Sequence, residues 1–178
     1  MNIVLIGYRA SGKTTVGRRL SALLGIPFRD TDEMIRQRTG KSVRQIVAEG
    51  GWPAFRDVEK TVVAGLSGLD GVVIALGGGA VTEKENVEAV KRKGLVIWLQ
   101  ADETSILERM GRETAGDEQR PPLRGGGMAE EVREMLAERT AVYRAHADLA
   151  VDTTGRSVEQ IVVEIMSVIR ARRIGIGV

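Results

Sequence analysis

Short apolar runs alternate along the chain with longer segments in which apolar residues have a helical spacing. The clearest apolar runs are residues 3–6, 72–76 and 95–99. Runs of this kind suit strands that are buried on both faces of a sheet. We also expect a short strand at residues 28–29, just before Asp30, and a last short strand at residues 149–151.

Helices are expected between these strands. Segments with helical character cover residues 15–24, 53–66, 102–110 and 129–143. Three pairs have the spacing of a capping box and mark further helix starts: Ser42 with Gln45, Thr82 with Glu85, and Ser157 with Gln160. Gly50-Gly51 should end the helix that Ser42 opens, and Pro53 suits the first turn of the next helix. The alternation predicts βαβ units, and therefore an α/β fold with a parallel sheet between two layers of helices.

Residues 111–127 interrupt this alternation. They are polar, charged and rich in Gly and Pro, and they show no periodicity. A segment of this length without a structural pattern is often functional in a compact domain. We therefore expect a mobile lid here, inside a single domain that spans residues 1–178.

The stretch Gly7-Tyr8-Arg9-Ala10-Ser11-Gly12-Lys13-Thr14 fits the pattern G-x-x-x-x-G-K-[ST]. Backbone amides of such a loop wrap a polyphosphate, the lysine reaches the β- and γ-phosphates, and the hydroxyl of the last residue coordinates Mg²⁺. The alternative is a chance match in a surface turn. The loop here stands between an expected strand and an expected helix, which is the order that the motif requires. We expect the following residues to contact ATP: Gly7, Ala10, Ser11, Gly12, Lys13, Thr14 and Thr15.

Two acids, Asp30 and Asp32, follow the expected strand at residues 28–29. Ligands of open α/β sheets lie beyond the carboxyl ends of the strands, so both side chains should face the site. The alternative is that the pair only caps the next helix. The usual Mg²⁺-binding acid is missing after residues 72–76, which run directly into glycines. We therefore favour Asp30 as the residue that holds the water shell of the metal, and Asp32 as the residue that holds or activates an acceptor hydroxyl.

Three consecutive glycines, Gly77, Gly78 and Gly79, end the strand at residues 72–76. A plain turn needs one or two glycines, so three favour a close approach between the backbone and a substrate. Arg56 with Glu59 could be an ordinary surface ion pair, and Arg139 could be a solvated helix residue. Taken together with the phosphate loop, these arginines suit an acceptor that carries hydroxyls and a carboxylate, which arginine binds in a bidentate manner.

The composition of the chain excludes several classes of binding partner. The net charge is only +2, although the pI is about 9.1, and we find no clustered basic patch, so we expect no nucleic-acid partner. The chain has no cysteine, which excludes disulfides and thiolate metal sites. No apolar run approaches the ~20 residues that span a bilayer, and no signal peptide is evident. We therefore expect a cytoplasmic protein with no membrane partner.

In this combination of motifs, the sequence resembles the shikimate kinase family. The matching segments are the GYRASGKT loop, Asp30-Thr31-Asp32, Phe55-Arg56 with Glu59, residues 76–80, Arg120-Pro121, and Glu138-Arg139 followed by Tyr143-Arg144. The resemblance covers residues 2–170. It implies a three-layer P-loop kinase with a five-stranded parallel sheet in the order 2-3-1-4-5, a mobile lid at residues 111–127 and a substrate-binding helical region at residues 32–66. It also implies Mg²⁺- and ATP-dependent phosphorylation of the shikimate 3-hydroxyl by a monomer, in the pathway to chorismate and the aromatic amino acids.

The resemblance also assigns roles to single residues. The residues that it places at the shikimate site are Asp32, Arg56, Gly77, Gly78, Gly79 and Arg139. Lys13 and the lid residue Arg120 would act on the transferring phosphate, and Asp32 would orient the attacking hydroxyl. Arg109 and Arg156 would flank adenine, while Thr14, and Asp30 through water, would hold Mg²⁺. Two features depart from the family pattern: Pro122 follows Arg120-Pro121, and Tyr8-Arg9 replaces smaller residues in the loop.

Two alternatives remain at this stage. A gluconate kinase, or another small-molecule kinase of the same fold, would also use an ATP loop and a hydroxylated carboxylate as acceptor. The glycine triplet with Arg56, Glu59 and Arg139 in this order argues against it. A nucleotide-dependent switch or binding module is the other alternative. The N-K-x-D motif that reads guanine is missing from the sequence, which argues against a GTPase.

Overall fold

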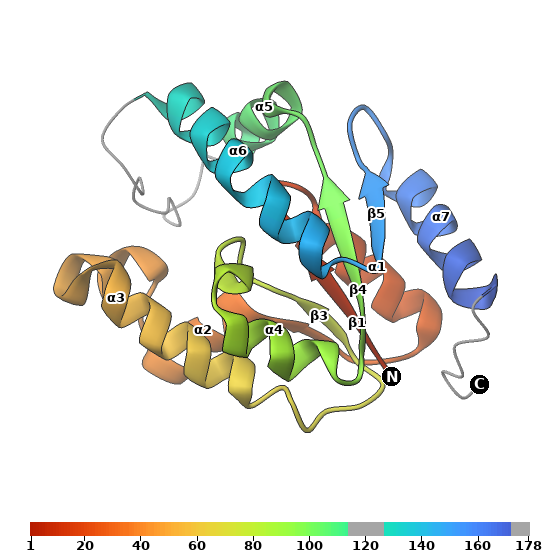
Figure 1. Cartoon of the computed structure of the whole chain (residues 1–178), viewed down its shortest axis with the longest axis horizontal. Coiled ribbons are helices and arrows are strands. Elements are labelled where there is room, and N and C mark those ends of the chain that lie inside the picture. The colour runs from red at the N-terminus through yellow and green to blue at the C-terminus, as the bar shows by residue number, and fades with distance from the viewer. Residues whose placement is uncertain (114–126, 172–178) are drawn as a thin grey trace.

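In the computed structural model, which describes residues 1–113 and 127–171, five parallel strands form one sheet in the order β2-β3-β1-β4-β5 (Figure 1). The strands are β1 Asn2–Ile6, β2 Phe28–Asp30, β3 Val73–Ala75, β4 Gly94–Gln100 and β5 Leu149–Asp152. In the centre of the sheet, Val4 of β1 pairs with Ile74 on one side and with Val96 on the other. The α/β class and the strand order predicted from the sequence are confirmed.

Seven α-helices and one short 3-10 helix connect the strands in the described part of the chain. They are α1 Lys13–Leu24, α2 Thr31–Thr39, α3 Val43–Ala64, η1 Ala80–Thr82, α4 Lys84–Lys91, α5 Glu103–Glu113, α6 Met128–His146 and α7 Val158–Ala171. Within residues 1–113 and 127–171, no helix is both long enough and apolar enough to cross a membrane.

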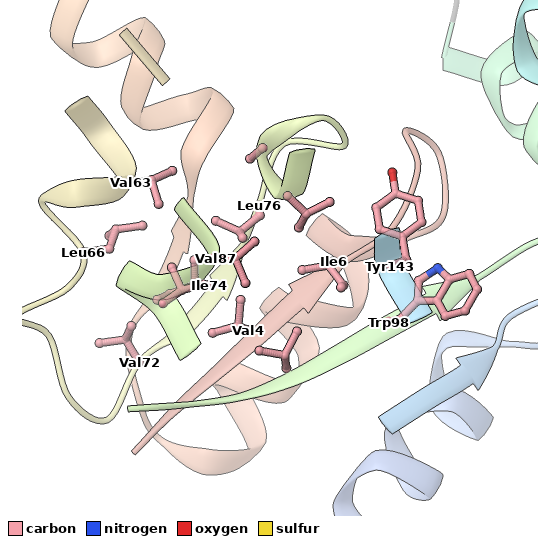
Figure 2. Packing of buried hydrophobic residues seen from close by; sticks show 14 residues of the cluster. Val4, Ile6, Val63, Leu66, Val72, Ile74, Leu76, Val87, Trp98 and Tyr143 are labelled. Carbon is pink, nitrogen blue, oxygen red and sulfur yellow. The ribbon is translucent and has the colours of Figure 1, made fainter. Parts of the chain in front are cut away.

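The three central strands, β1, β3 and β4, bury both of their faces, as the continuous apolar runs predict. Ile3 and Leu5 of β1 face α1 and α7, whereas Val4 and Ile6 face the layer that contains α3, α4 and α6. Figure 2 shows this second face, with Val4, Ile6 and Ile74 at its centre and with Tyr143 and Trp98 at one end. Because successive side chains of a strand point to opposite faces, β1, β3 and β4 contribute to both cores, whereas the edge strands β2 and β5 contribute only to the core beside α1 and α7.

Two of the three expected helix caps are present. Ser42 and Gln45 form a reciprocal capping box at the start of α3. Ser157 and Gln160 make the same pair of bonds before α7. The third expected cap, at Thr82, is wrong. Its hydroxyl donates instead to the Gly79 carbonyl at 2.7 Å, because Thr82 belongs to η1, and α4 begins two residues later.

The break expected at Gly50-Gly51 is confirmed as a kink. Gly51 has φ 72° and ψ −178° inside α3, so the helix changes direction there before it continues through Pro53. This kink turns α3 towards α2, and the two helices enclose a small separate core around Ile35 and Phe55. The same segment carries Arg56 and Glu59, so the kink sets the position of both charges.

Candidate active site

The candidate site lies at the carboxyl edge of the sheet, where three neighbouring strands end. The phosphate loop follows β1, Asp30 ends β2 with Asp32 two residues later, and the glycine triplet (Gly77, Gly78 and Gly79) follows β3. Since parallel strands all end at the same edge, segments far apart in the sequence meet here. Figure 1 shows the segment after β3 between α3 on one side and α6 on the other.

The loop between β1 and α1 has the backbone of an anion-binding turn. Gly7, Ala10 and Gly12 all have positive φ values, of 142°, 57° and 95°. A Cβ on Gly7 would lie 2.5 Å from the Leu99 carbonyl oxygen, so only glycine fits. The Lys13 ammonium donates to the carbonyls of Gly7 and Tyr8 at 3.0 and 2.7 Å. The lysine therefore arches over its own loop, at the N-terminus of α1, where the helix dipole favours an anion.

Asp30 is the cap of the next helix and also contacts the phosphate-loop residue Thr14. Its Oδ1 accepts from the backbone amide of Asp32 at 3.0 Å, so Asp30 is the N-cap of α2. Its Oδ2 accepts from the Thr14 hydroxyl at 2.7 Å. This contact brings a carboxylate and a hydroxyl together at the start of α1. Both are hard oxygen donors of the kind that Mg²⁺ takes in addition to water and substrate phosphates.

Asp32 lies beside the first glycine of the triplet. A Cβ on Gly77 would lie 3.2 Å from Asp32 Oδ1 and 2.6 Å from Glu59 Oε1. The absence of a side chain at Gly77 is therefore what lets two carboxylates approach the backbone. The Gly77 amide is fixed by a 2.8 Å hydrogen bond to the Thr31 hydroxyl.

Arg56 and Glu59 form an ion pair, and the interpretation as an ordinary surface pair is wrong. Glu59 is fully buried and Arg56 is only 23% exposed. The rings of Trp52 and Phe55 lie 5.8 and 5.3 Å from the Arg56 guanidinium carbon. The guanidinium is thereby held in one place next to Gly79, where an added Cβ would lie 2.3 Å from Arg56 Nη2.

The middle glycine joins the triplet to the phosphate loop. A Cβ on Gly78 would lie 3.2 Å from the Arg9 amide nitrogen and 3.3 Å from the Gly7 carbonyl oxygen. The two backbones therefore lie too close together to leave room for a side chain between them. An acceptor bound on the triplet would lie directly beside the anion loop.

Arg139 is half-buried rather than a solvated helix residue. Its guanidinium carbon lies 5.9 Å from the centre of the Tyr8 ring. Tyr143, one turn later on α6, is buried, and burial raises the pKa of its hydroxyl to about 12 against the opposing effect of Arg139 and Arg56. Both arginines are therefore close enough to act on this hydroxyl, although they come from different helices. Burial likewise raises the pKa of Tyr8, whose ring remains neutral beside Arg139.

Arg109 and Arg156 both contact the segment that follows β5. Arg109 donates to the Thr153 carbonyl at 2.7 Å and to the Ala10 carbonyl of the phosphate loop at 3.3 Å. Arg156 donates to the Asp152 carbonyl at 2.8 Å and pairs with Glu164 at 2.6 Å. The expected adenine-flanking residues thus lie at one end of the loop. Arg120, Pro122 and most of the expected lid lie outside the described residues.

One contact was not predicted from the sequence. Arg9 of the phosphate loop pairs with Glu131 of α6 at 2.7 Å, and the Glu131 side chain is only 4% exposed. Glu131 stands in the first turn of α6, 122 residues away. The arginine at position 9, where smaller residues are common in the loop, was the one sign in the sequence that this position makes an additional contact. Nothing in the sequence identifies Glu131 as its partner.

Comparisons with known proteins agree with this geometry. Residues 9–170 match the family model described as shikimate kinase. A shikimate kinase of Syntrophus aciditrophicus is 40% identical over 98% of this chain and 94% of its own length. One of Pseudomonas syringae pv. syringae is 42% identical over 93% of this chain and 94% of its own length.

A comparison with solved structures also finds a shikimate kinase. A shikimate kinase from Acinetobacter baumannii in complex with shikimate has a TM-score of 0.89 and 32% identity, and the match covers 97% of this chain and 94% of the other. A gluconokinase from Sinorhizobium meliloti has a TM-score of 0.56 and 16% identity, with 96% and 92% covered. At that identity the second likeness concerns the fold alone.

Proposed function

The chain belongs to the shikimate kinase family, and we propose that it transfers the γ-phosphoryl group of ATP to the 3-hydroxyl of shikimate, a step towards chorismate and the aromatic amino acids. One observation supports this most directly. The glycine triplet touches the backbone of the phosphate loop at Gly78 and touches two carboxylates and a fixed guanidinium at its ends. An acceptor with hydroxyls and a carboxylate would fit this platform and would lie next to the phosphate.

Phosphoryl transfer proceeds through a loose transition state, so the protein mainly positions groups and stabilises charge. We assign Asp32 to the acceptor hydroxyl, which it would orient and from which it would take the proton. Lys13 and the amides of the phosphate loop would bind the phosphates. Arg120, which belongs to the expected lid, would add positive charge near the transferring group. Arg56 and Arg139 would bind the acceptor carboxylate, with Gly79 beside them.

The site also fits Mg²⁺. Within residues 1–113 and 127–171, no group of three or more His, Cys, Asp or Glu side chains could hold a metal ion. Mg²⁺ needs no such cage, because it keeps several waters and binds through one or two protein oxygens in addition to substrate phosphates. Thr14 would supply one oxygen, and Asp30 would act through water. The metal would neutralise charge on the β- and γ-phosphates.

We further propose that the enzyme is a cytoplasmic monomer whose single domain spans residues 1–178, with the lid at residues 111–127 and the acceptor region at residues 32–66. The basis is the small-molecule character of both substrates and the placement of the proposed acceptor groups within one chain. Gel filtration at several concentrations in the presence of both substrates tests the monomer. A concentration-dependent dimer peak would contradict it.

The decisive experiment is a coupled assay for ADP release with Mg²⁺-ATP and, in parallel, shikimate, gluconate and nucleoside monophosphates. We expect turnover with shikimate alone, and slow ATP hydrolysis without an acceptor. Turnover of gluconate at a comparable kcat/KM, with none of shikimate, would overturn the proposal. Removal of Mg²⁺ by a chelator should abolish turnover, and addition of excess Mg²⁺ should restore it.

A further inference from the structure

Hydrogen bonds fix most of the backbone of the glycine triplet. At its start, the Gly77 amide donates to the Thr31 hydroxyl at 2.8 Å. At its end, the Gly79 carbonyl accepts from the Thr82 hydroxyl at 2.7 Å. Within residues 1–113 and 127–171, the structure gives the amides of Gly78 and Gly79 no acceptor. These two amides are therefore the donors that the triplet can offer to a ligand.

The central carbonyl has a partner of a different kind. The Tyr143 hydroxyl donates to the Gly78 carbonyl at 2.5 Å, from a helix 65 residues further along the chain. Tyr143 is 1% exposed. Its ring packs beside Trp98, with ring centres 5.7 Å apart. Figure 2 shows the two rings side by side, with the Tyr143 hydroxyl pointing away from Trp98. Packing therefore aims this hydroxyl at one carbonyl.

The bond has a consequence for the neighbouring amide. The Gly78 carbonyl and the Gly79 amide belong to one planar trans peptide, so they point in opposite directions. When Tyr143 holds the carbonyl towards α6, the Gly79 amide must point away from α6. Gly79 lies against the Arg56 guanidinium of α3. This peptide is the central one of a turn that the Ala80 amide closes by donating to the Gly77 carbonyl at 2.9 Å. Because both of its residues are glycines, the peptide can flip within that turn when the Tyr143 bond is absent.

The Tyr143 hydroxyl also lies close to both arginines of the proposed acceptor site. Burial raises the pKa of this hydroxyl, and the positive charges of Arg139 and Arg56 oppose that rise. The hydroxyl thus stands between the arginine on α6 and the backbone of the triplet. Because burial raises its pKa, the group keeps its proton and remains a donor at any pH at which the enzyme would work.

We propose that Tyr143 is a positioning residue of the acceptor site: its hydroxyl orients the Gly78–Gly79 peptide so that the Gly79 amide donates to the anionic group of the acceptor. This inference rests on the proposed function. It identifies a residue that does not touch the acceptor but sets the geometry of a group that does.

The test is Tyr143→Phe, which removes the hydroxyl and keeps the ring. The Gly79 amide would bind the acceptor in the ground state and in the transition state alike, so its loss should raise KM and leave kcat unchanged. We expect the KM for shikimate to rise about 10–100-fold, the effect of one hydrogen bond to a charged group. The KM for ATP should stay within about twofold, since the phosphate loop keeps its own bonds.

A matched control separates this effect from a loss of stability. Ile165→Val removes one methyl group from the opposite core, where Ile165 is fully buried. It should lower the melting temperature and leave both KM values unchanged. If Tyr143→Phe shifts the KM for ATP and for shikimate equally, or if Ile165→Val produces the same change, the positioning role is wrong.

A measurement on the unsubstituted protein tests the same inference without relying on the variant. In protein labelled with ¹⁵N-glycine, shikimate should shift the Gly79 amide resonance and leave that of Gly68, a surface glycine, in place. An unresponsive Gly79 amide in an enzyme that turns over shikimate would overturn the inference alone. An enzyme with no turnover of shikimate would overturn the proposed function instead.

Discussion

Gly79→Ala tests the packing of the acceptor site with a single methyl group. Gly79 has φ −102° and ψ −4°, which alanine adopts without strain, so the backbone itself does not require glycine. The added Cβ would lie 2.3, 2.8 and 2.9 Å from three atoms of the Arg56 guanidinium. These distances are too short for any real contact, so the guanidinium must move.

The magnitude follows from the bond to the acceptor carboxylate that a displaced Arg56 would lose. Arg56 is paired with Glu59, which is fully buried. A hydrogen bond to a charged group contributes about 1.5–3 kcal/mol, and a 1.4 kcal/mol difference is a factor of ten. We therefore expect kcat/KM for shikimate to fall about 10–100-fold. The KM for ATP should change little, because Gly78 rather than Gly79 touches the phosphate loop.

The assay is steady-state kinetics for both substrates, with Gly68→Ala as the control. A Cβ on Gly68 would meet no atom within 4 Å, so this variant should behave like the original protein. Arg56→Ala and the double variant complete a double-mutant cycle. If the methyl group acts through Arg56, its effect should largely disappear when Arg56 is already alanine. Additive losses, or a normal kcat/KM in Gly79→Ala, would refute this reasoning.

Three further results are expected. The variant Asp32→Asn should keep its affinity for ATP, while its kcat should fall by about 10²-fold or more, the range for a lost general base. A near-normal kcat would show that Asp32 has only a structural role. Arg9→Met should destabilise the fold by about 2 kcal/mol, less than the loss of one partner from a fully buried pair because Arg9 is partly exposed. In urea unfolding, the double variant Arg9→Met with Glu131→Gln should recover part of the free energy of unfolding that Arg9→Met loses. No recovery would show that Arg9 and Glu131 do not stabilise each other. Burial raises the pKa of Tyr143 from its ordinary value of 10.0 to about 12. Between pH 10 and 12 only the unfolded chain loses this proton, so the residue costs no stability below pH 10 and lowers stability over that range. The difference in unfolding free energy between the original protein and Tyr143→Phe should therefore shift against the original protein over that range; a constant difference would show that the tyrosine is not protected from ionisation.

The strands and most helix ends could be predicted from the sequence because their signals are local. Apolar runs identified the buried strands, although β3 is one residue shorter at each end than the run at residues 72–76. Capping pairs located the starts of α3 and α7. The pair at Thr82 had the right spacing but failed, because the turn after the glycine triplet uses that hydroxyl. A local pattern cannot show that a tertiary contact has already taken its donor.

The candidate site was less predictable, because its contacts join distant segments. The sequence could offer Arg56 and Glu59 only as neighbours on a helix, and burial of Glu59 depends on how α3 packs over the sheet edge. The cap alternative for Asp30 is confirmed through Oδ1, and Oδ2 is left to contact Thr14, so capping does not exclude the proposed metal role. The partner of Arg9 and the partner of Tyr143 lie 122 and 65 residues away. Such pairs follow from the fold and not from spacing.

The strand order explains why these segments form one site. Because β3 lies between β2 and β1, the glycine triplet lies between the acids that follow β2 and the phosphate loop that follows β1. An acceptor on the triplet would have the Asp32 carboxylate on one side and the phosphate loop on the other, which is the arrangement that in-line transfer to a hydroxyl requires. A side chain at any of the three glycines would come within 3.2 Å of an acid, the loop or Arg56. With the proposed function, the triplet would set the geometry of both substrates at once, and substitutions there should alter catalysis before they alter the fold.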